Sequence, residues 1–176
     1  MKFYLKSLVL ACVLALPIGL SACSEKNDPR SETLSQDPQT LQAETVKLDV
    51  YKSPNCGCCG DWIDHIEAAG FETLVHHPEN LSLVKEANGI RQNMQSCHTA
   101  ISNHGYVFEG HIPADVMQRF LENPPAEALG LAVPGMPIGS PGMEMGDRYD
   151  DYAVLLIKKD GRTEVFERIS GRGHHE

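Results

Sequence analysis

The chain has 176 residues, with 15 Lys and Arg against 24 Asp and Glu, so its formal net charge at pH 7 is −9. A chain this acidic is a poor partner for nucleic acid or for anionic lipid headgroups, and we expect it to bind neither through its surface charge. The same charge suits a protein that attracts cations.

The first 22 residues predict a lipoprotein signal peptide. Lys2 and Lys6 flank the start of an apolar run, residues 8–20, which is too short for an ordinary membrane span and suits a signal sequence. The run ends in Leu-Ser-Ala-Cys, which resembles a bacterial lipobox, so we expect Cys23 to be lipidated and to become the first residue of the mature chain. The alternative is a cleaved secretory signal with an incidental cysteine.

The lipid at Cys23 predicts a membrane-anchored lipoprotein that faces the periplasm. Ser24 follows the cysteine in place of an aspartate and resembles the class sorted to the outer membrane, which is the expected location in a cell that has one. Residues 23–44 are polar with almost nothing apolar and predict a disordered tether. Residues 45–171 are enough for one domain with a single core, and residues 172–176 predict a flexible tail.

Within that domain the pattern of apolar residues alternates between strands and helices. We expect strands at 47–52, 71–76, 99–102 and 106–110, helices at 58–69, 81–87 and 113–121, and a closing hairpin of strands at 152–158 and 163–168. Residues 130–148 are rich in proline and glycine and predict no regular element. The order predicts an α/β protein with a thioredoxin-like fold and a mixed sheet, extended by a Met/Pro/Gly-rich loop and a C-terminal β-hairpin.

Three cysteines, Cys56, Cys58 and Cys59, occupy the turn between the first expected strand and the first expected helix. The free N–H groups and the dipole of a helix N-terminus stabilise thiolates there. In a thioredoxin-like fold the residues just before the third strand lie against this turn. The topology therefore places Cys97 beside the three other cysteines.

Three interpretations of these four cysteines remain open. The first is a soft-metal site, since thiolates and thioethers select copper(I), and the adjacent thiolates of Cys58 and Cys59 are suited to bridge several ions in one cluster. The second is a thiol–disulfide oxidoreductase with Cys56 as nucleophile and Cys59 as resolving thiol, which leaves two cysteines surplus. The third is a pair of structural disulfides, which the crowding of the first three cysteines disfavours. Zinc is the rival metal, but its structural sites favour paired C-x₂-C knuckles.

Two further groups of residues are candidates for the same site. Met136, Met143 and Met145 lie in the proline- and glycine-rich loop, either as soft ligands or a lid, or as side chains that pack onto the core. His98 follows Cys97 directly and is a candidate ligand or proton donor. His111 stands at the end of an expected strand near the site, and for it we expect either a role in orienting a metal ligand or a structural role.

Four segments taken together resemble one known family: residues 51–59 (YKSPNCGCC), 96–100 (SCHTA), 109–114 (EGHIPA) and 134–143 (PGMPIGSPGM). The combination is similar to the CopG-like copper-resistance proteins, long described as a domain of unknown function, over about residues 46–166. The resemblance implies a periplasmic thioredoxin-like protein that binds copper through the C-x-C-C and the later cysteine, in a cysteine-bridged multi-copper cluster. It also implies periplasmic copper-handling proteins as partners, because family members are often encoded beside them. A role in interconverting copper(I) and copper(II) has been proposed for the family, so enzymatic activity stays open.

The sequence therefore predicts an extracytoplasmic protein of copper resistance or homeostasis. We expect it to hold copper(I), in a multi-copper thiolate cluster, for sequestration, relay or Cu(I)/Cu(II) interconversion. The expected metal ligands are Cys56, Cys58, Cys59 and Cys97. The alternative function is thiol–disulfide oxidoreduction by Cys56 and Cys59.

Overall fold

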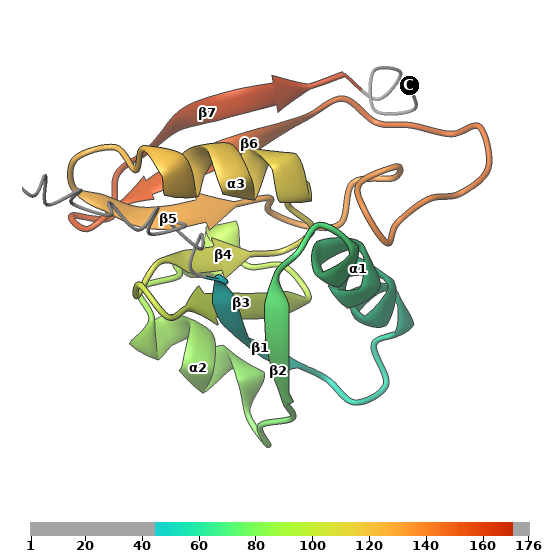
Figure 1. Cartoon of the computed structure of the whole chain (residues 1–176), viewed down its shortest axis with the longest axis horizontal. Helices are drawn as coiled ribbons and strands as arrows, with labels where there is room; N and C mark the ends of the chain where they lie inside the picture. Colours follow the sequence, from blue (N-terminus) through green and yellow to red (C-terminus); the bar gives the residue numbers. More distant parts are fainter. Residues whose placement is uncertain (1–44, 171–176) are drawn as a thin grey trace, which may run out of the picture. The chain divides into compact units, whose positions relative to one another are not determined.

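Seven strands and three α-helices follow one another in residues 45–170, the part of the chain that the computed structural model describes (Figure 1). In chain order they are β1 (Lys47–Lys52), α1 (Gly57–Ala68), β2 (Glu72–His76), α2 (Leu81–Ala87), the short 3₁₀ helix η1 (Gln92–Met94), β3 (His98–Ser102), β4 (Val107–Glu109), α3 (Ala114–Glu122), β5 (Ala128–Ala132), β6 (Tyr152–Lys158) and β7 (Thr163–Ile169). None of the helices in this range is long and apolar enough to span a bilayer. The expected signal peptide, tether, lipidation site at Cys23 and C-terminal tail lie outside the described residues.

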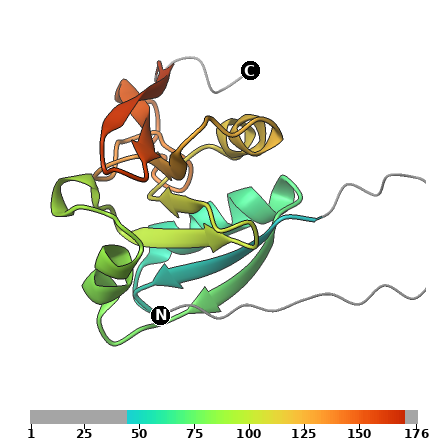
Figure 2. The same ribbon diagram turned by 90° about the vertical axis from the view of Figure 1, so that its left-hand side faces the viewer.

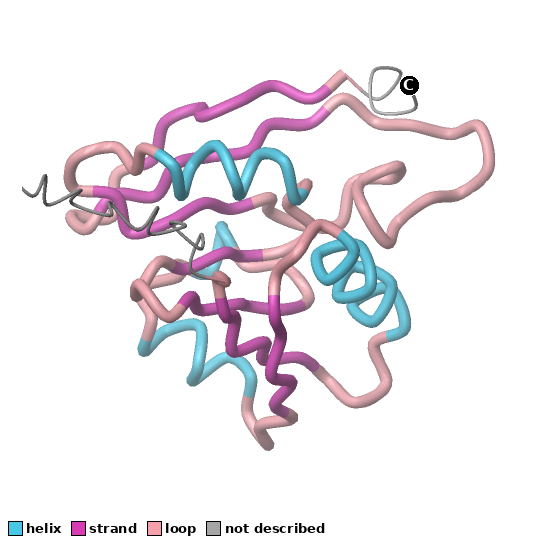
Figure 3. The backbone as a smooth tube through the Cα atoms, in the orientation of Figure 1, coloured by secondary structure: helices cyan, strands magenta, loops and turns pink. Residues whose placement is uncertain are grey.

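All seven strands form one mixed sheet in the order β2-β1-β3-β4-β5-β6-β7. β1 pairs parallel with β2, and β4 pairs parallel with β5, while the other neighbours are antiparallel. Figures 2 and 3 show how the strands follow one another across the sheet and how the closing hairpin of β6 and β7 ends it. The predicted α/β class, mixed sheet and C-terminal hairpin are confirmed.

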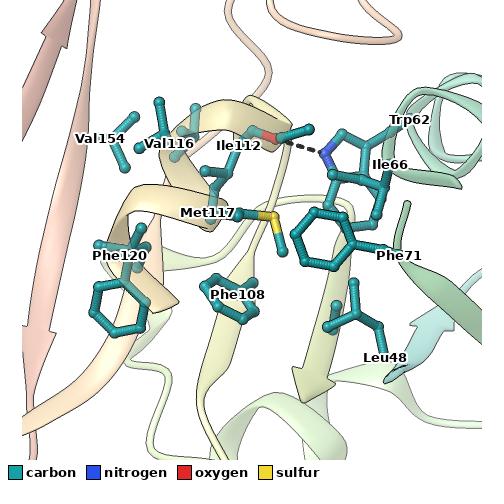
Figure 4. Packing of buried hydrophobic residues seen from close by; sticks show 14 of the residues in the cluster. Leu48, Trp62, Ile66, Phe71, Phe108, Ile112, Val116, Met117, Phe120 and Val154 are labelled. Carbon is teal, nitrogen blue, oxygen red and sulfur yellow. Dashed lines mark hydrogen bonds between the residues drawn. The ribbon is translucent and has the colours of Figure 1, made fainter. Parts of the chain in front are cut away.

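The alternation of side chains along the strands divides the core between the two faces of this sheet. On one face, Trp62 and Ile66 of α1 and Phe120 of α3 pack with Leu48 of β1 and Phe108 of β4 (Figure 4). The other face carries a smaller cluster around η1 and the residues after α2, formed by Ile90, Met94, Val107, Ala132 and Ile157. The cysteine-bearing end of α1 therefore rests on the larger core.

One expectation about the secondary structure is wrong. Residues 130–148 were expected to hold no regular element, yet Gly130 and Ala132 lie in β5, between β4 and β6. The glycine is what permits this strand, because a Cβ atom at Gly130 would overlap the carbonyl oxygen of Val107 on the neighbouring strand. The register of β5 with β6 also shifts between Ala128 and Gly130, which interrupts the alternation that marks a strand in a sequence.

Candidate metal centre

The cysteine turn connects β1 to α1. Cys56 is the N-cap of the helix, and its N–H donates to the carbonyl of Ser53 at 3.2 Å. Cys58 and Cys59 follow in the first turn of the helix, which carries no acidic residue. The unpaired N–H groups at this end of the helix therefore favour negative charge on the cysteine sulfurs. Cys59 is fully buried against the core, while Cys56 and Cys58 are partly exposed. The turn therefore presents sulfur atoms both to the protein interior and to solvent.

The structure brings the sulfurs of all four cysteines together. Cys56 and Cys59 are joined by a disulfide, with their Cα atoms 5.5 Å apart, while Cys58 and Cys97 are free thiols. The Sγ of Cys58 lies 3.4 Å from that of Cys56, and the Sγ of Cys97 lies 3.2 Å from that of Cys59. All four ligand atoms lie within 4.8 Å of one another. Reduction of the disulfide, which takes two electrons, would make four thiols available in one place.

Two histidines extend this sulfur cluster toward the interior. The Nε2 atom of His111 lies 2.8 Å from the Sγ of Cys97, and the Nδ1 atom of His98 lies 3.4 Å from it. Cys59, Cys97, His98 and His111 form a second group whose ligand atoms lie within 4.8 Å of one another. His111, for which the sequence predicted a role in orienting a ligand or a structural role, thus stands among the candidate ligands. The one signal in its favour was its place at a strand end beside the expected site.

Burial keeps the groups around Cys97 uncharged. Burial, and next the charge of Cys58, raise the pKa of the Cys97 thiol to about 12. Burial lowers the pKa of His98 well below its ordinary value, with His111 as the next cause, and burial also lowers the pKa of His111. At neutral pH and without metal, Cys97 is therefore a thiol, and His98 and His111 are neutral imidazoles. A neutral imidazole can bind a metal through the lone pair of its unprotonated nitrogen.

His98 has a buried nitrogen that the protein does not use. Its ring is fully buried, with its centroid 4.2 Å from that of the Trp62 ring, and its Nε2 atom has no hydrogen-bond partner among residues 45–170. Trp62 is fixed in turn by a hydrogen bond of 2.9 Å from its Nε1–H to the carbonyl of Ile112 (Figure 4). Buried polar atoms are normally satisfied, so a buried imidazole with one nitrogen unpaired, whose other nitrogen lies 3.4 Å from the sulfur of Cys97, fits a site that takes a soft or borderline metal ion.

The loop between β5 and β6 covers the site at three points. The carbonyl of Pro141 lies 2.7 Å from Nδ1 of His111, and the Oγ of Ser96 donates to the carbonyl of Gly135. Gly142 lies against the first turns of α1, where a Cβ atom would stand 2.5 Å from the carbonyl oxygen of Cys58. In Figure 1 this loop runs from the β5 end of the sheet toward α1. It is therefore positioned as a lid on the cysteine turn.

The three methionines of this lid are not buried in the core. Met136 and Met145 are 51% and 52% exposed, and Met143 is partly exposed. The hypothesis that all three plug onto the core is therefore wrong. Two of the three side chains, Met136 and Met145, are thus exposed on the loop that covers the cysteines.

Sequence reasoning missed two charged residues next to the site. Lys85 of α2 and Glu109 of β4 are 3% and 0% exposed and form an ion pair. The available signal was the spacing of Lys85, which lies four residues after Leu81 and so shares a helix face with an apolar residue.

Comparisons with known proteins agree with the motifs. A family model described as "Protein of unknown function, DUF411" matches residues 94–143, which include Cys97, His111 and much of the lid. A comparison with curated proteins found no match. Among solved structures, copper resistance protein CopG in form 2 is 43% identical, covers 72% of this chain and 100% of its own, and superimposes with a TM-score of 0.68. Form 1 of the same protein is 44% identical, with 72% and 98% covered and a TM-score of 0.67.

The chain belongs to the CopG family. The predicted resemblance is therefore confirmed, and it extends over the whole length of the solved CopG chain in form 2. The residues matched by the family model include three of the candidate donors, Cys97, His98 and His111.

Proposed function

We propose that this CopG homologue is a copper-resistance protein that binds copper(I) as its cargo. The observation that carries the proposal is the donor set: four cysteine sulfurs and two buried imidazoles meet at the N-terminal end of α1. Soft thiolate ligands favour copper(I) over harder ions. The related solved structures are of copper resistance protein CopG, a name that points to the same metal.

The number of donors favours more than one copper ion. Cys58 and Cys59 are adjacent in the chain and cannot easily both bind one tetrahedral ion without strain, but neighbouring thiolates can bridge two ions. Cys59 and Cys97 belong to both donor groups, and so connect the sulfur-rich side to the two histidines. A multinuclear thiolate cluster uses all these donors, and Met136, Met143 and Met145 are further candidate ligands on the lid.

The arrangement of the first elements supports a thioredoxin-like origin for the site. The strand order β2-β1-β3-β4, with β3 antiparallel to β1, places the turn before α1 next to the segment before β3. In this proposal the fold supplies the proximity of two chain segments, and the additional cysteines convert a redox-type turn into a metal site.

The proposed location is the periplasmic side of a membrane, with a lipid anchor at Cys23 and the outer membrane favoured in a cell that has one. What supports it is the lipobox-like end of the predicted signal peptide. In that place the protein would sequester copper, relay it to other copper-handling proteins or interconvert its oxidation states.

A second candidate function is thiol–disulfide oxidoreduction, because Cys56 and Cys59 form a disulfide and Cys56 is the more exposed of the two. A substrate dithiol would attack this disulfide, become a disulfide itself, and leave two thiols on the protein. Cys58 and Cys97 have no assigned part in that reaction.

The deciding experiment is an anaerobic titration of the purified, fully reduced protein with copper(I), with bound metal counted by native mass spectrometry. We expect several copper ions per chain, and their joint loss in Cys59→Ser and Cys97→Ser. Ser102→Ala, at the far end of β3 and outside both donor groups, is the control and should bind as many ions as the parent. Binding of one ion or none, with rapid disulfide exchange on a model protein, would contradict the copper proposal and favour the oxidoreductase.

A further inference from the structure

A buried ion pair stands on the opposite face of the sheet from the histidines of the site. The Nζ of Lys85 lies 2.5 Å from Oε1 of Glu109, and the two side chains are 4% and 0% exposed. Taking two charges out of water costs more than their attraction returns, unless further hydrogen bonds complete the geometry. The neighbouring cluster on this face is apolar, so an apolar pair of similar size would serve packing alone at least as well.

The hydrogen bonds that complete this pair come from the segment that carries Cys97. Oε1 of Glu109 accepts the backbone N–H of Ser96 at 2.6 Å, and Oε2 accepts the hydroxyl of Thr99 at 2.6 Å. The Nζ of Lys85 also donates to the Thr99 hydroxyl oxygen at 2.9 Å. One carboxylate therefore holds the chain immediately before Cys97 and again two residues after it.

The pairing of β3 with β4 and a contact with the lid also hold the residues on both sides of Cys97. Thr99 lies opposite Glu109 in the β3–β4 ladder, and the N–H of Gly110 donates to the carbonyl of His98 at 3.1 Å. Ser96 is fixed twice, since its hydroxyl also donates to the carbonyl of Gly135 in the lid. Cys97 thus lies in a segment whose backbone is fixed on both sides of it, and its sulfur lies 3.2 Å from that of Cys59.

We propose that Glu109, with its charge balanced by Lys85, is a positioning residue for the metal site. It holds the Cys97 sulfur close to that of Cys59 before any metal arrives, so that binding does not require the loop to be ordered first. The consequence for copper rests on the proposed function, but the positioning itself is a property of the metal-free chain and is measurable there.

The test measures the effective concentration of the Cys59 and Cys97 thiols with respect to each other. In a Cys56→Ser/Cys58→Ser background, Cys59 and Cys97 are left as a pair, and their disulfide is equilibrated with glutathione to give their effective concentration. Thr99→Val removes one hydroxyl without leaving an unpaired charge, and we expect it to lower the effective concentration about tenfold. Peptide mapping by mass spectrometry assigns the disulfide to these two cysteines.

Two further variants complete the set. Lys85→Met/Glu109→Gln removes both charges together, and we expect it to lower the effective concentration at least as much as Thr99→Val. Ser102→Ala is the matched control: Ser102 is 5% exposed on the same strand, but its hydroxyl accepts the N–H of Tyr106 at the far end of β3. We expect the control to leave the effective concentration unchanged.

The outcomes separate this proposal from the proposed function. An unchanged effective concentration in Thr99→Val, with the fold intact by circular dichroism, overturns the positioning role even if the double variant does not fold. A fall in Thr99→Val equal to that in Ser102→Ala also overturns it, since the effect is then general destabilisation.

The same substitutions in the four-cysteine protein give a second readout. We expect copper(I) affinity, measured by competition with a chelator, to fall about tenfold in Thr99→Val, with a changed ultraviolet thiolate-to-copper band. If the effective concentration falls and the parent binds no copper(I), the positioning role stands and the copper function fails.

Discussion

The Nε2 atom of His111 lies 2.8 Å from the sulfur of Cys97, and the Nδ1 atom of the same ring lies 2.7 Å from the carbonyl of Pro141. A carbonyl only accepts, so the neutral ring carries its proton on Nδ1 and donates it to Pro141. Nε2 is then an acceptor and receives the S–H of Cys97. The imidazole thus connects the lid to a thiol that is protonated in the metal-free state.

The first prediction follows from this protonated thiol. The pKa of Cys97 is raised from 9.0 to about 12 by burial and then by Cys58. Because the thiolate is the nucleophile, the alkylation rate of Cys97 in the folded, metal-free protein should rise about tenfold per pH unit up to at least about pH 10. Mass-spectrometric mapping of iodoacetamide adducts measures it, and the same residue in urea should level off near pH 9.0. A plateau near neutral pH in the folded protein would contradict the assignment.

The raised pKa of Cys97 also makes the stability of the fold depend on pH. Since the folded value lies above the unfolded one, the stability that the protonated Cys97 contributes is present below about pH 9 and is lost as pH rises toward about 12. Copper(I) binding at neutral pH must displace this proton, so loading should release protons into a weakly buffered solution. A pH-indicator dye measures the release, and Cys97→Ser should release fewer protons.

The second prediction concerns acid stability. Burial lowers the pKa of His98 well below 6.5, so the unfolded chain takes up a proton at a higher pH than the folded one. The stability that neutral His98 contributes is therefore present above about pH 6.5 and falls by about 1.4 kcal/mol for each pH unit below it. Urea unfolding of the metal-free protein between about pH 5 and 7 measures this slope.

Two variants isolate the contribution of His98. His98→Phe keeps a ring beside Trp62 and should unfold with a shallower pH dependence than the parent. His104→Gln, at an exposed turn, is the control and should keep the parental slope. Equal slopes in the parent and in His98→Phe would show that other groups cause the acid sensitivity.

How much of the fold was predictable depends on how local its signals are. β1 and α2 have the bounds expected from the sequence, and Asn80 caps α2 as its side chain accepts the N–H of Leu83. β5 was missed because its glycine and its register shift hide the alternation, and because the reason for Gly130 lies on a neighbouring strand.

The site shows the same division. The approach of Cys97 to the cysteine turn could be predicted, because strand topology alone brings the two segments together. The contacts of His111 with Cys97 and of Lys85 with Glu109 span 14 and 24 residues and depend on side-chain directions. The spacing of Lys85 indicates its helix face, but no spacing in the sequence identifies Glu109 or Cys97 as the partner.

The third prediction uses the single tryptophan of the chain as a reporter. Trp62 lies 4.2 Å from the ring of His98, centroid to centroid, so metal uptake at the second donor group should change its emission. We expect tryptophan fluorescence to fall in step with copper(I) binding and to stop falling at the stoichiometry found by mass spectrometry. Emission that stays constant while copper binds would place the metal away from the histidines.

The fourth prediction tests the lid. Gly142 has a φ of +81°, and a Cβ atom there would lie 2.5 Å from the carbonyl oxygen of Cys58 and 2.8 Å from the amide nitrogen of Trp62. Gly142→Ala must therefore move the loop off α1, and we expect it to lower the free energy of unfolding by about 3 kcal/mol, of which about 1 is backbone strain and the rest steric. Copper(I) should then also dissociate faster in chelator competition.

Gly146→Ala is the control for this substitution. Gly146 also has a positive φ, +60°, but a Cβ atom there meets nothing within 4 Å. It should therefore show only the backbone cost of about 1 kcal/mol, with copper(I) dissociation unchanged. If both alanine variants release copper at the parental rate, the contact between the loop and α1 does not retain the metal, and the lid contributes to folding alone.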